Sequence, residues 1–154
     1  VDFLQNLGTL VKLSDVDPQV FFLGGLDQSG EDGKFAYIWQ DDVIRVTFHV
    51  ATMMPNKEYD TNCNNKKLHI GNNYVSIVYN ESGEEYNINT IKGQFNFAAI
   101  IIQPLDHNTN RVVVKVKDEL KELIALSEPK IVSDQNVAIL ARQLALHANV
   151  RMLL

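Results

Sequence analysis

The sequence contains one cysteine, Cys63, among its 154 residues. Without a second thiol the chain cannot form an internal disulfide, whereas small secreted scaffolds usually carry several. The chain also lacks a basic segment followed by an apolar stretch at its start, and no apolar run approaches the ~20 residues that a membrane-spanning helix needs. We therefore expect a domain without a transmembrane segment that resides in a reducing compartment, the cytosol or the nucleus. Of these we favour the cytoplasm, with recruitment to membrane surfaces through other subunits or regions.

Positive charge is also scarce. The 14 Lys and Arg residues are outnumbered by 19 Asp and Glu residues, which gives a net charge of −5. A duplex-binding face needs a dense field of Lys and Arg, so we expect no nucleic-acid partner. The one basic cluster of interest is the pair Lys66-Lys67.

The size and composition indicate one domain. A chain of 154 residues with 45% apolar content can bury a core without disulfides or metals. We find no repeat, low-complexity tract or linker that would divide residues 1–154. The chain begins at Val1 without an initiator methionine, from which we expect a domain excised from a longer protein.

The order of apolar patterns is typical of an α/β or α+β domain, with a mixed central sheet flanked by helices. The pattern predicts an opening helix or irregular apolar segment at 3–13 and late helices at 117–126 and 136–148, the last capped by Ser133 or Asp134. Polar composition predicts surface loops at 24–34 and 56–67. The predicted strands are 20–23, 35–39, 43–51, 74–79, 95–103 (ended by Pro104) and 112–116.

The loop at 24–34 is rich in glycine and acidic residues, but it matches no ligand-binding loop. A phosphate loop needs glycine five residues before the Gly33-Lys34 pair and Ser or Thr after it, where this chain has Gln28 and Phe35. A calcium loop would need glycine where Asp32 stands. We interpret the segment as a solvated loop.

Metal and nucleophile chemistry also lack support. The histidines form no zinc-binding pattern, no nucleophile elbow is present, and Cys63 has no neighbouring base in the sequence. Asn80-Glu81-Ser82 matches a glycosylation acceptor, but the cysteine usage argues against secretion and we expect it to be unmodified. We therefore predict no metal and no cofactor bound by this chain.

The segment from His69 to Asn73 is a junction between a loop and the next element. By residue chemistry alone, Gly71 allows a tight turn, and Asn72 or Asn73 can cap a short helix or occupy a left-handed position. Such Gly-Asn pairs are usually structural.

Several ordered segments nevertheless resemble one family, the tuberin-type branch of the Rap-GAP proteins. The His-Ile-Gly-Asn element is typical of Rap-GAP domains in general, and the Lys-Gly-Gln-Phe-Asn-Phe stretch points to the tuberin branch. The resemblance therefore implies the Rap-GAP catalytic-domain fold over nearly the whole chain. The similar segments are 22–27 with 30–33, Phe48–Pro55, Lys66–Asn73, Ile91–Phe97 and Ala141–Asn149.

The resemblance implies a domain that stimulates GTP hydrolysis by a Ras-superfamily GTPase, Rheb-like for this branch. In such domains an asparagine thumb enters the active site of the partner, which itself holds GTP and Mg²⁺. Asn72 occupies the thumb position. A larger complex, formed through regions of the parent protein outside this chain, is also expected.

Six further residues receive supporting roles from the resemblance. His69 would orient the thumb or touch the partner, with a structural hydrogen-bonded histidine as the alternative. Lys66 and Lys67 would attract an acidic GTPase surface or form an ordinary solvated pair. Gly71 and Asn73 flank the thumb, and Asn80 would brace it or simply end a strand.

The chain departs from the family pattern at two positions. Leu68 stands where tuberin has Arg, which puts the partner electrostatics in question, and Asn73 stands where Asp is usual, which puts the capping of the thumb in question. Two alternatives remain: a catalytically silent module that binds a GTPase or dimerises, and a domain that binds nucleotide itself.

Overall fold

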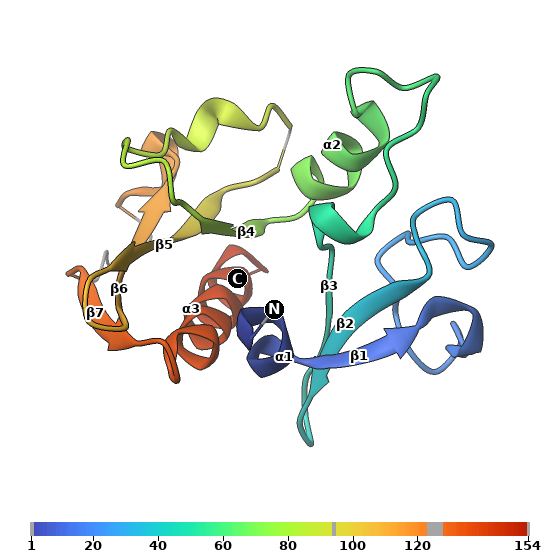
Figure 1. Cartoon of the computed structure of the whole chain (residues 1–154), viewed down its shortest axis with the longest axis horizontal. Coiled ribbons are helices and arrows are strands. Elements are labelled where there is room, and N and C mark those ends of the chain that lie inside the picture. The colour runs from blue at the N-terminus through green and yellow to red at the C-terminus, as the bar shows by residue number, and fades with distance from the viewer. Residues whose placement is uncertain (1, 94, 123–127, 154) are drawn as a thin grey trace. The chain divides into compact units, whose positions relative to one another are not determined.

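The structure is a computed structural model that describes residues 2–93, 95–122 and 128–153 (Figure 1). Its contacts divide the chain into two compact units, Val1–Ile70 and Gly71–Leu154, and each unit has its own sheet. The mixed α/β class expected from the sequence is confirmed, with the strands divided between two sheets.

The first unit contains a three-stranded antiparallel sheet in the order β1-β2-β3. The register pairs Leu10 with Tyr37, and Tyr37 with Phe48, across the central strand β2. The elements of this unit are α1 (Asp2–Leu7), β1 (Thr9–Lys12), η1 (Leu13–Asp15), β2 (Phe35–Gln40), β3 (Arg45–Phe48), η2 (Ala51–Met53) and α2 (Asn64–Gly71, whose last residue belongs to the second unit).

The opening helix predicted at 3–13 is shorter than expected because the chain changes to a strand after Leu7. A Cβ atom on Gly8 would lie 2.4 Å from the backbone oxygen of Ile38, so glycine is required where the chain meets β2. Thr9 then pairs with Ile38, and the apolar residues of this segment serve a strand instead of a helix.

Of two more predictions in this unit, one strand is absent and the other is shorter than expected. Residues 20–23 do not form a strand: the N–H groups of Val20 and Phe21 both bond to the carbonyl of Asp17 at a turn, and Phe22 and Leu23 have no regular secondary structure. Strand β3 starts later than residue 43 because the carboxylate of Asp41 accepts hydrogen bonds from the N–H groups of Val43 (2.8 Å) and Ile44 (2.7 Å), and the strand ends before Ala51, where η2 begins. These bonds, that of Ile44 first, lower the pKa of Asp41 and fix the β2–β3 turn.

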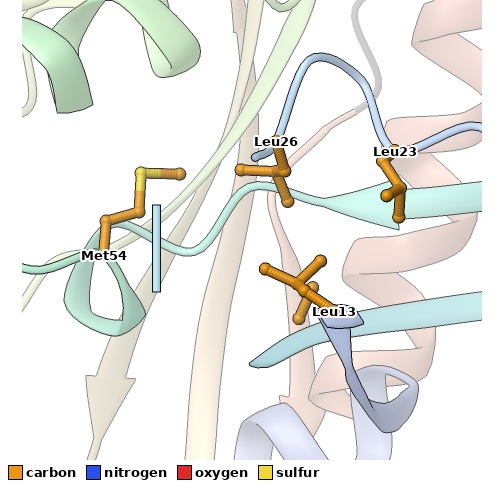
Figure 2. Close-up of a cluster of buried hydrophobic side chains, with 5 residues drawn as sticks. Leu13, Leu23, Leu26 and Met54 are labelled. Atoms are coloured by element: carbon orange, nitrogen blue, oxygen red, sulfur yellow. The ribbon is translucent and has the colours of Figure 1, made fainter. Parts of the chain in front are cut away.

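The loop between η1 and β2 is folded over the apolar core of the first unit and is only partly solvated. Figure 2 shows four of the core side chains, which come from this loop, from η1 and from the segment after η2. Gly33 lies at a φ of +102°, and a Cβ there would lie 2.4 Å from the oxygen of Met53. The buried cluster consists of Leu13, Leu23, Leu26, Ala36 and Met54.

The second unit contains a four-stranded sheet in the order β4-β5-β6-β7, in which only β4 and β5 are parallel. Helix α3 packs against β4, β5 and β6 (Figure 1). The core of this unit includes Ala98, Val116 and Ala148. Its elements are β4 (Val75–Tyr79), η3 (Ile88–Thr90), β5 (Ala98–Leu105), β6 (Thr109–Val116), η4 (Asp118–Leu120), β7 (Lys130–Ser133) and α3 (Val137–Leu153).

Strand β5 continues through Pro104, which had been expected to end it. Pairing with β4 stops at Ile102, so among the described residues Pro104 has a neighbouring strand only on the β6 side, where it lies opposite Asn110. A proline in a strand is tolerated where its missing N–H is not needed by a second neighbour.

The sequence also mispredicted the C-terminal elements. Strand β7 was missed because it has four residues and pairs only with β6. Helix α3 extends to Leu153, beyond the expected end at 148.

The two residues expected to cap α3 have other contacts. Ser133 ends β7, and the carboxylate of Asp134 accepts a hydrogen bond from the Asn110 amide at 2.7 Å. Of the helix expected at 117–126, the structure shows the short η4, and residues 123–127 lie outside the described residues.

Candidate functional site

The candidate site is built on α2, which begins inside the segment expected to be a loop at 56–67. The helix starts at Asn64 because both oxygens of the Asp60 carboxylate accept backbone N–H groups there, from Asn64 at 2.9 Å and from Asn65 at 2.8 Å. A carboxylate at this position satisfies N–H groups that have no partner within the helix. The bonds from Asn65 and then Asn64 lower the pKa of Asp60.

Helix α2 has a face that is turned inward and a face that is exposed. Asn65 and His69 lie one turn apart and are partly buried, with the His69 side chain 14% exposed. On the other side Lys67 is exposed and Leu68 is 61% exposed. Lys66 is partly buried.

The inward face meets the carboxylate of Asp32, which is 6% exposed. Its Oδ1 accepts a hydrogen bond from Asn65 Nδ2 at 2.8 Å and lies 3.1 Å from His69 Nε2. Its Oδ2 accepts the backbone N–H of Asp27 at 2.8 Å. Burial raises the pKa of Asp32, but the bonds from Asp27, Asn65 and His69 outweigh it and hold the pKa below its usual value.

A second histidine, His49, lies beside His69. Their ring centroids are 5.5 Å apart at an interplanar angle of 70°. Burial lowers the pKa of His49, and hydrogen bonds with the backbone of Leu23 and His69 oppose the shift only in part. Gly24 makes room for this ring, because a Cβ there would lie 2.5 Å from His49 Nε2.

Gly71, the last residue of α2, belongs to the second unit, where it packs on the backbone of Gly93. A Cβ on Gly93 would lie 2.5 Å from the oxygen of Gly71, and a Cβ on Gly71 would lie 3.2 Å from the oxygen of Lys92. Two backbones can approach this closely only where side chains are absent. The Lys-Gly pair of the segment Ile91–Phe97 therefore lies against the residue that precedes Asn72.

Asn72 is exposed and follows α2 directly. The carbonyl of Asn73 accepts the N–H of Asn96 at 2.7 Å, and that of Tyr74 accepts the N–H of Phe97 at 2.8 Å. Asn96 is fully buried in a left-handed conformation, and its Oδ1 accepts the hydroxyl of Ser76 at 2.8 Å. The chain is thus held immediately after residue 72 while residue 72 itself faces solvent.

The structure does not bring Asn80 near the thumb position. The five residues of β4 separate it from Tyr74, a length of roughly 16 Å in a strand. Its amide donates to the carbonyl of Glu84 at 2.7 Å, and its Oδ1 accepts the N–H and the hydroxyl of Ser82. These contacts agree with the interpretation that Asn80 ends a strand.

The four arginines lie on other elements. Arg45 is on β3, where its guanidinium donates to the carbonyl of Val20 at 2.5 Å. Arg111 is on β6, and Arg142 and Arg151 are on α3. None belongs to α2 or to residues 72–74.

Other chemistry finds no support in the described ranges. Among the residues placed, no group of three or more His, Cys, Asp or Glu side chains is arranged to hold a metal ion. None of the helices in this part of the chain is both long enough and apolar enough to cross a membrane.

Sequence reasoning missed two structural parts of the site. Composition predicts a solvated loop around Asp32, because composition alone does not reveal that a carboxylate will be buried against a helix. Gly93 has no local signal apart from its place in the segment Ile91–Phe97. In both cases the signal lay in the segments of family resemblance, since 30–33 and Ile91–Phe97 both contain residues that contact α2.

Comparisons of this chain with family models, with known proteins and with solved structures all point to the same family. The model of the Rap/ran-GAP family matches residues 1–153. The chain is 44% identical over 158 aligned positions to the tuberous sclerosis 2 protein homolog of Schizosaccharomyces pombe, covering 96% of this chain and 12% of that protein. It is 33% identical over 132 positions to the Ral GTPase-activating protein subunit alpha-2 of Mus musculus, covering 86% of this chain and 7% of that protein.

A solved structure of a TSC2 GAP domain is similar to this chain, with a TM-score of 0.88 and 35% sequence identity. The match covers 99% of this chain and 81% of that one. The chain thus spans about four fifths of the solved chain, but only 12% and 7% of the two longer relatives.

Proposed function

This chain belongs to the Rap/ran-GAP family, and on that premise we propose that it is a GTPase-activating domain. It binds a GTP-loaded small GTPase of the Ras superfamily, of the Rheb type, and inserts the carboxamide of Asn72 into the partner's phosphate pocket. The observation that carries the proposal is the position of Asn72: an exposed amide directly after a helix that is anchored at both ends.

An amide is suited to this task. GTP hydrolysis requires a water molecule aligned with the γ-phosphate and stabilisation of the charge that develops in the transition state. A carboxamide offers an oxygen that accepts a hydrogen bond from the water and an NH₂ group that donates to a phosphoryl oxygen. Its contribution depends on placement, because reacting groups must be held within hydrogen-bond reach of each other.

The partner provides the rest of the reaction centre. GTP and Mg²⁺ are held by the GTPase, and this chain contributes a side chain in trans. Arg45 is engaged with the Val20 carbonyl, and the other arginines lie on β6 and α3, which favours an amide over an arginine finger. The exposed Lys67, in the middle of α2, can attract an acidic GTPase surface.

The larger protein context is part of the proposal. The two relatives named above are much longer than this chain. We propose that the parent protein acts in a larger cytoplasmic complex, whose other regions bring this domain to the membrane surfaces where its GTPase resides.

The test is single-turnover GTP hydrolysis by a panel of small GTPases, including Rheb-type and Ral-type proteins, with and without the 154-residue chain. A full GAP effect of about 10⁵-fold corresponds to roughly 7 kcal/mol of barrier. Asn72→Ala should reduce the stimulated rate at least ~100-fold, as for other residues that act only on the transition state. Its free energy of unfolding should change by no more than about 0.5 kcal/mol, because the side chain is exposed.

Asn89→Ala is the matched control, since Asn89 is another exposed asparagine in the second unit. It should leave the stimulated rate unchanged. If Asn72→Ala retained full stimulation, the thumb assignment would be wrong. Intact binding to a GTPase without any rate enhancement by the unaltered chain would favour a catalytically silent binding module, and nucleotide binding by the isolated chain would favour a domain with its own nucleotide site.

A further inference from the structure

We propose that Asp32 is a positioning residue for Asn72: its carboxylate binds two side chains of α2 and thereby fixes the orientation of the helix that presents the amide. The inference rests on the proposed function and adds to it a residue from a distant part of the sequence. Asp32 touches neither the partner nor the reacting atoms in this scheme, so its effect passes through α2.

The two contacts on α2 are placed to fix the helix. Asn65 and His69 are four residues apart and point to the same side of α2, and both bond to Asp32 Oδ1, at 2.8 Å and 3.1 Å. A single contact would leave the helix free to rotate about it, whereas two contacts one turn apart restrict both rotation and sliding. Asn72 follows within one turn of His69.

The carboxylate is itself held from the other side. Its Oδ2 accepts the N–H of Asp27, and the Asp27 carboxylate accepts the N–H groups of Ser29 and Glu31, both at 2.9 Å. Gly33, next to Asp32, is fixed by its close approach to Met53. The loop that carries Asp32 is therefore itself held in place. Because breaking the hydrogen bonds of a buried carboxylate costs free energy, the orientation of α2 that keeps these bonds is favoured over others.

Asp32→Asn tests this role with little change in shape. Three donors converge on Asp32, from Asp27, Asn65 and His69. An asparagine has a single acceptor oxygen, so whichever way the amide is turned, its NH₂ group faces at least one of these donors. The substitution should loosen α2 while leaving the apolar core of the first unit intact.

The primary measurement is single-turnover hydrolysis by the GTP-loaded Rheb-type GTPase, as a function of the concentration of the chain. For Asp32→Asn we expect a decrease in the saturating rate of up to about 100-fold, with little change in the half-saturating concentration. The second measurement is amide hydrogen exchange, which should accelerate in residues 64–72 and stay unchanged in the central strand β5.

Two control variants distinguish a loss of helix positioning from the loss of a negative charge and from a loss of stability. Glu31→Gln removes a negative charge one residue away, from a side chain that is 64% exposed and pairs with Lys57; it should leave rate and exchange unchanged. Leu13→Ala disturbs the apolar core near the same loop. It should lower the melting temperature but keep the saturating rate at temperatures where the chain is folded.

The outcomes are distinct. A wild-type rate and wild-type protection of α2 in Asp32→Asn would overturn the positioning role, as would a rate loss no larger than that of Leu13→Ala. If Asn72→Ala retained its rate, the proposed function would fail, and the exchange of α2 would still decide whether Asp32 fixes the helix. Should Asp32→Asn not fold, Asn65→Ala removes one α2 donor and should give a smaller loss of the same kind.

Discussion

The chain is held in different ways on the two sides of Asn72. Before it, α2 is attached through polar side chains to one buried carboxylate, that of Asp32. After it, β4 is paired with β5, whose residues Ala98–Ile102 are at most 7% exposed. Apolar burial gives most of the free energy of folding but little direction, whereas buried hydrogen bonds add less and specify a geometry. We infer that the sheet supplies stability and that the polar contacts supply placement.

The largest expected effect comes from the apolar side. Ile100→Ala removes a fully buried side chain from the middle of β5 and should reduce the free energy of unfolding by about 2–5 kcal/mol. Urea unfolding followed by circular dichroism measures it. Ile131→Ala on β7, where the side chain is 63% exposed, is the control and should cost much less. Equal losses in the two variants would contradict the assignment of the core to β5.

A smaller effect is expected from the backbone contact between Gly93 and Gly71 at the end of α2. Gly93→Ala places a Cβ 2.5 Å from the oxygen of Gly71, so one backbone must shift, at a cost of about 1–3 kcal/mol. Because Gly71 precedes Asn72, the saturating rate of stimulated hydrolysis should fall as well. Lys92→Ala, at the exposed neighbouring residue, should change neither quantity. Unchanged stability and rate in Gly93→Ala would show that the close approach is unimportant.

The smallest expected effect is a pH dependence of the free energy of unfolding, caused by His49, which lies beside His69 of α2. The pKa of His49 is lowered in the folded chain, chiefly by burial, from the ordinary value of 6.5. As the pH falls below this value the unfolded chain takes up the proton first, so the free energy of unfolding should decrease. Thermal unfolding of the chain between pH 7 and pH 5 measures the slope.

His49→Gln should flatten this slope, since glutamine does not titrate in the range. The lowered pKa of Asp32 acts in the same direction at still lower pH, because its stabilising contribution is lost as the carboxylate becomes protonated. If the slope of stability against pH between pH 7 and pH 5 were identical in the unaltered chain and in His49→Gln, protonation of His49 would not be the cause of the pH dependence.

The sequence predicted those parts of the fold that have strong local patterns. The alternating and β-branched residues of β2, β4 and β6 predicted strands, and the apolar spacing of α3 predicted a helix. It failed where a distant partner decides the local structure. Leu10 and Val11 became part of a strand because β2 pairs with residues 9–12. The polar residues from 64 onward form a helix that Asp32, 33 positions away from Asn65, holds in place.

The sequence by itself determined the class of fold, the family resemblance and the identity of the candidate amide, because these depend on residue types and on their order along the chain. Only the tertiary structure showed that Asn72 is exposed, that Gly71 lies on Gly93, and that Asp32 is buried between Asp27 and α2. The physical reason is that burial and hydrogen bonding join residues far apart in the sequence: Asp32 and Asn65 are separated by 33 positions, and no local pattern announces their contact.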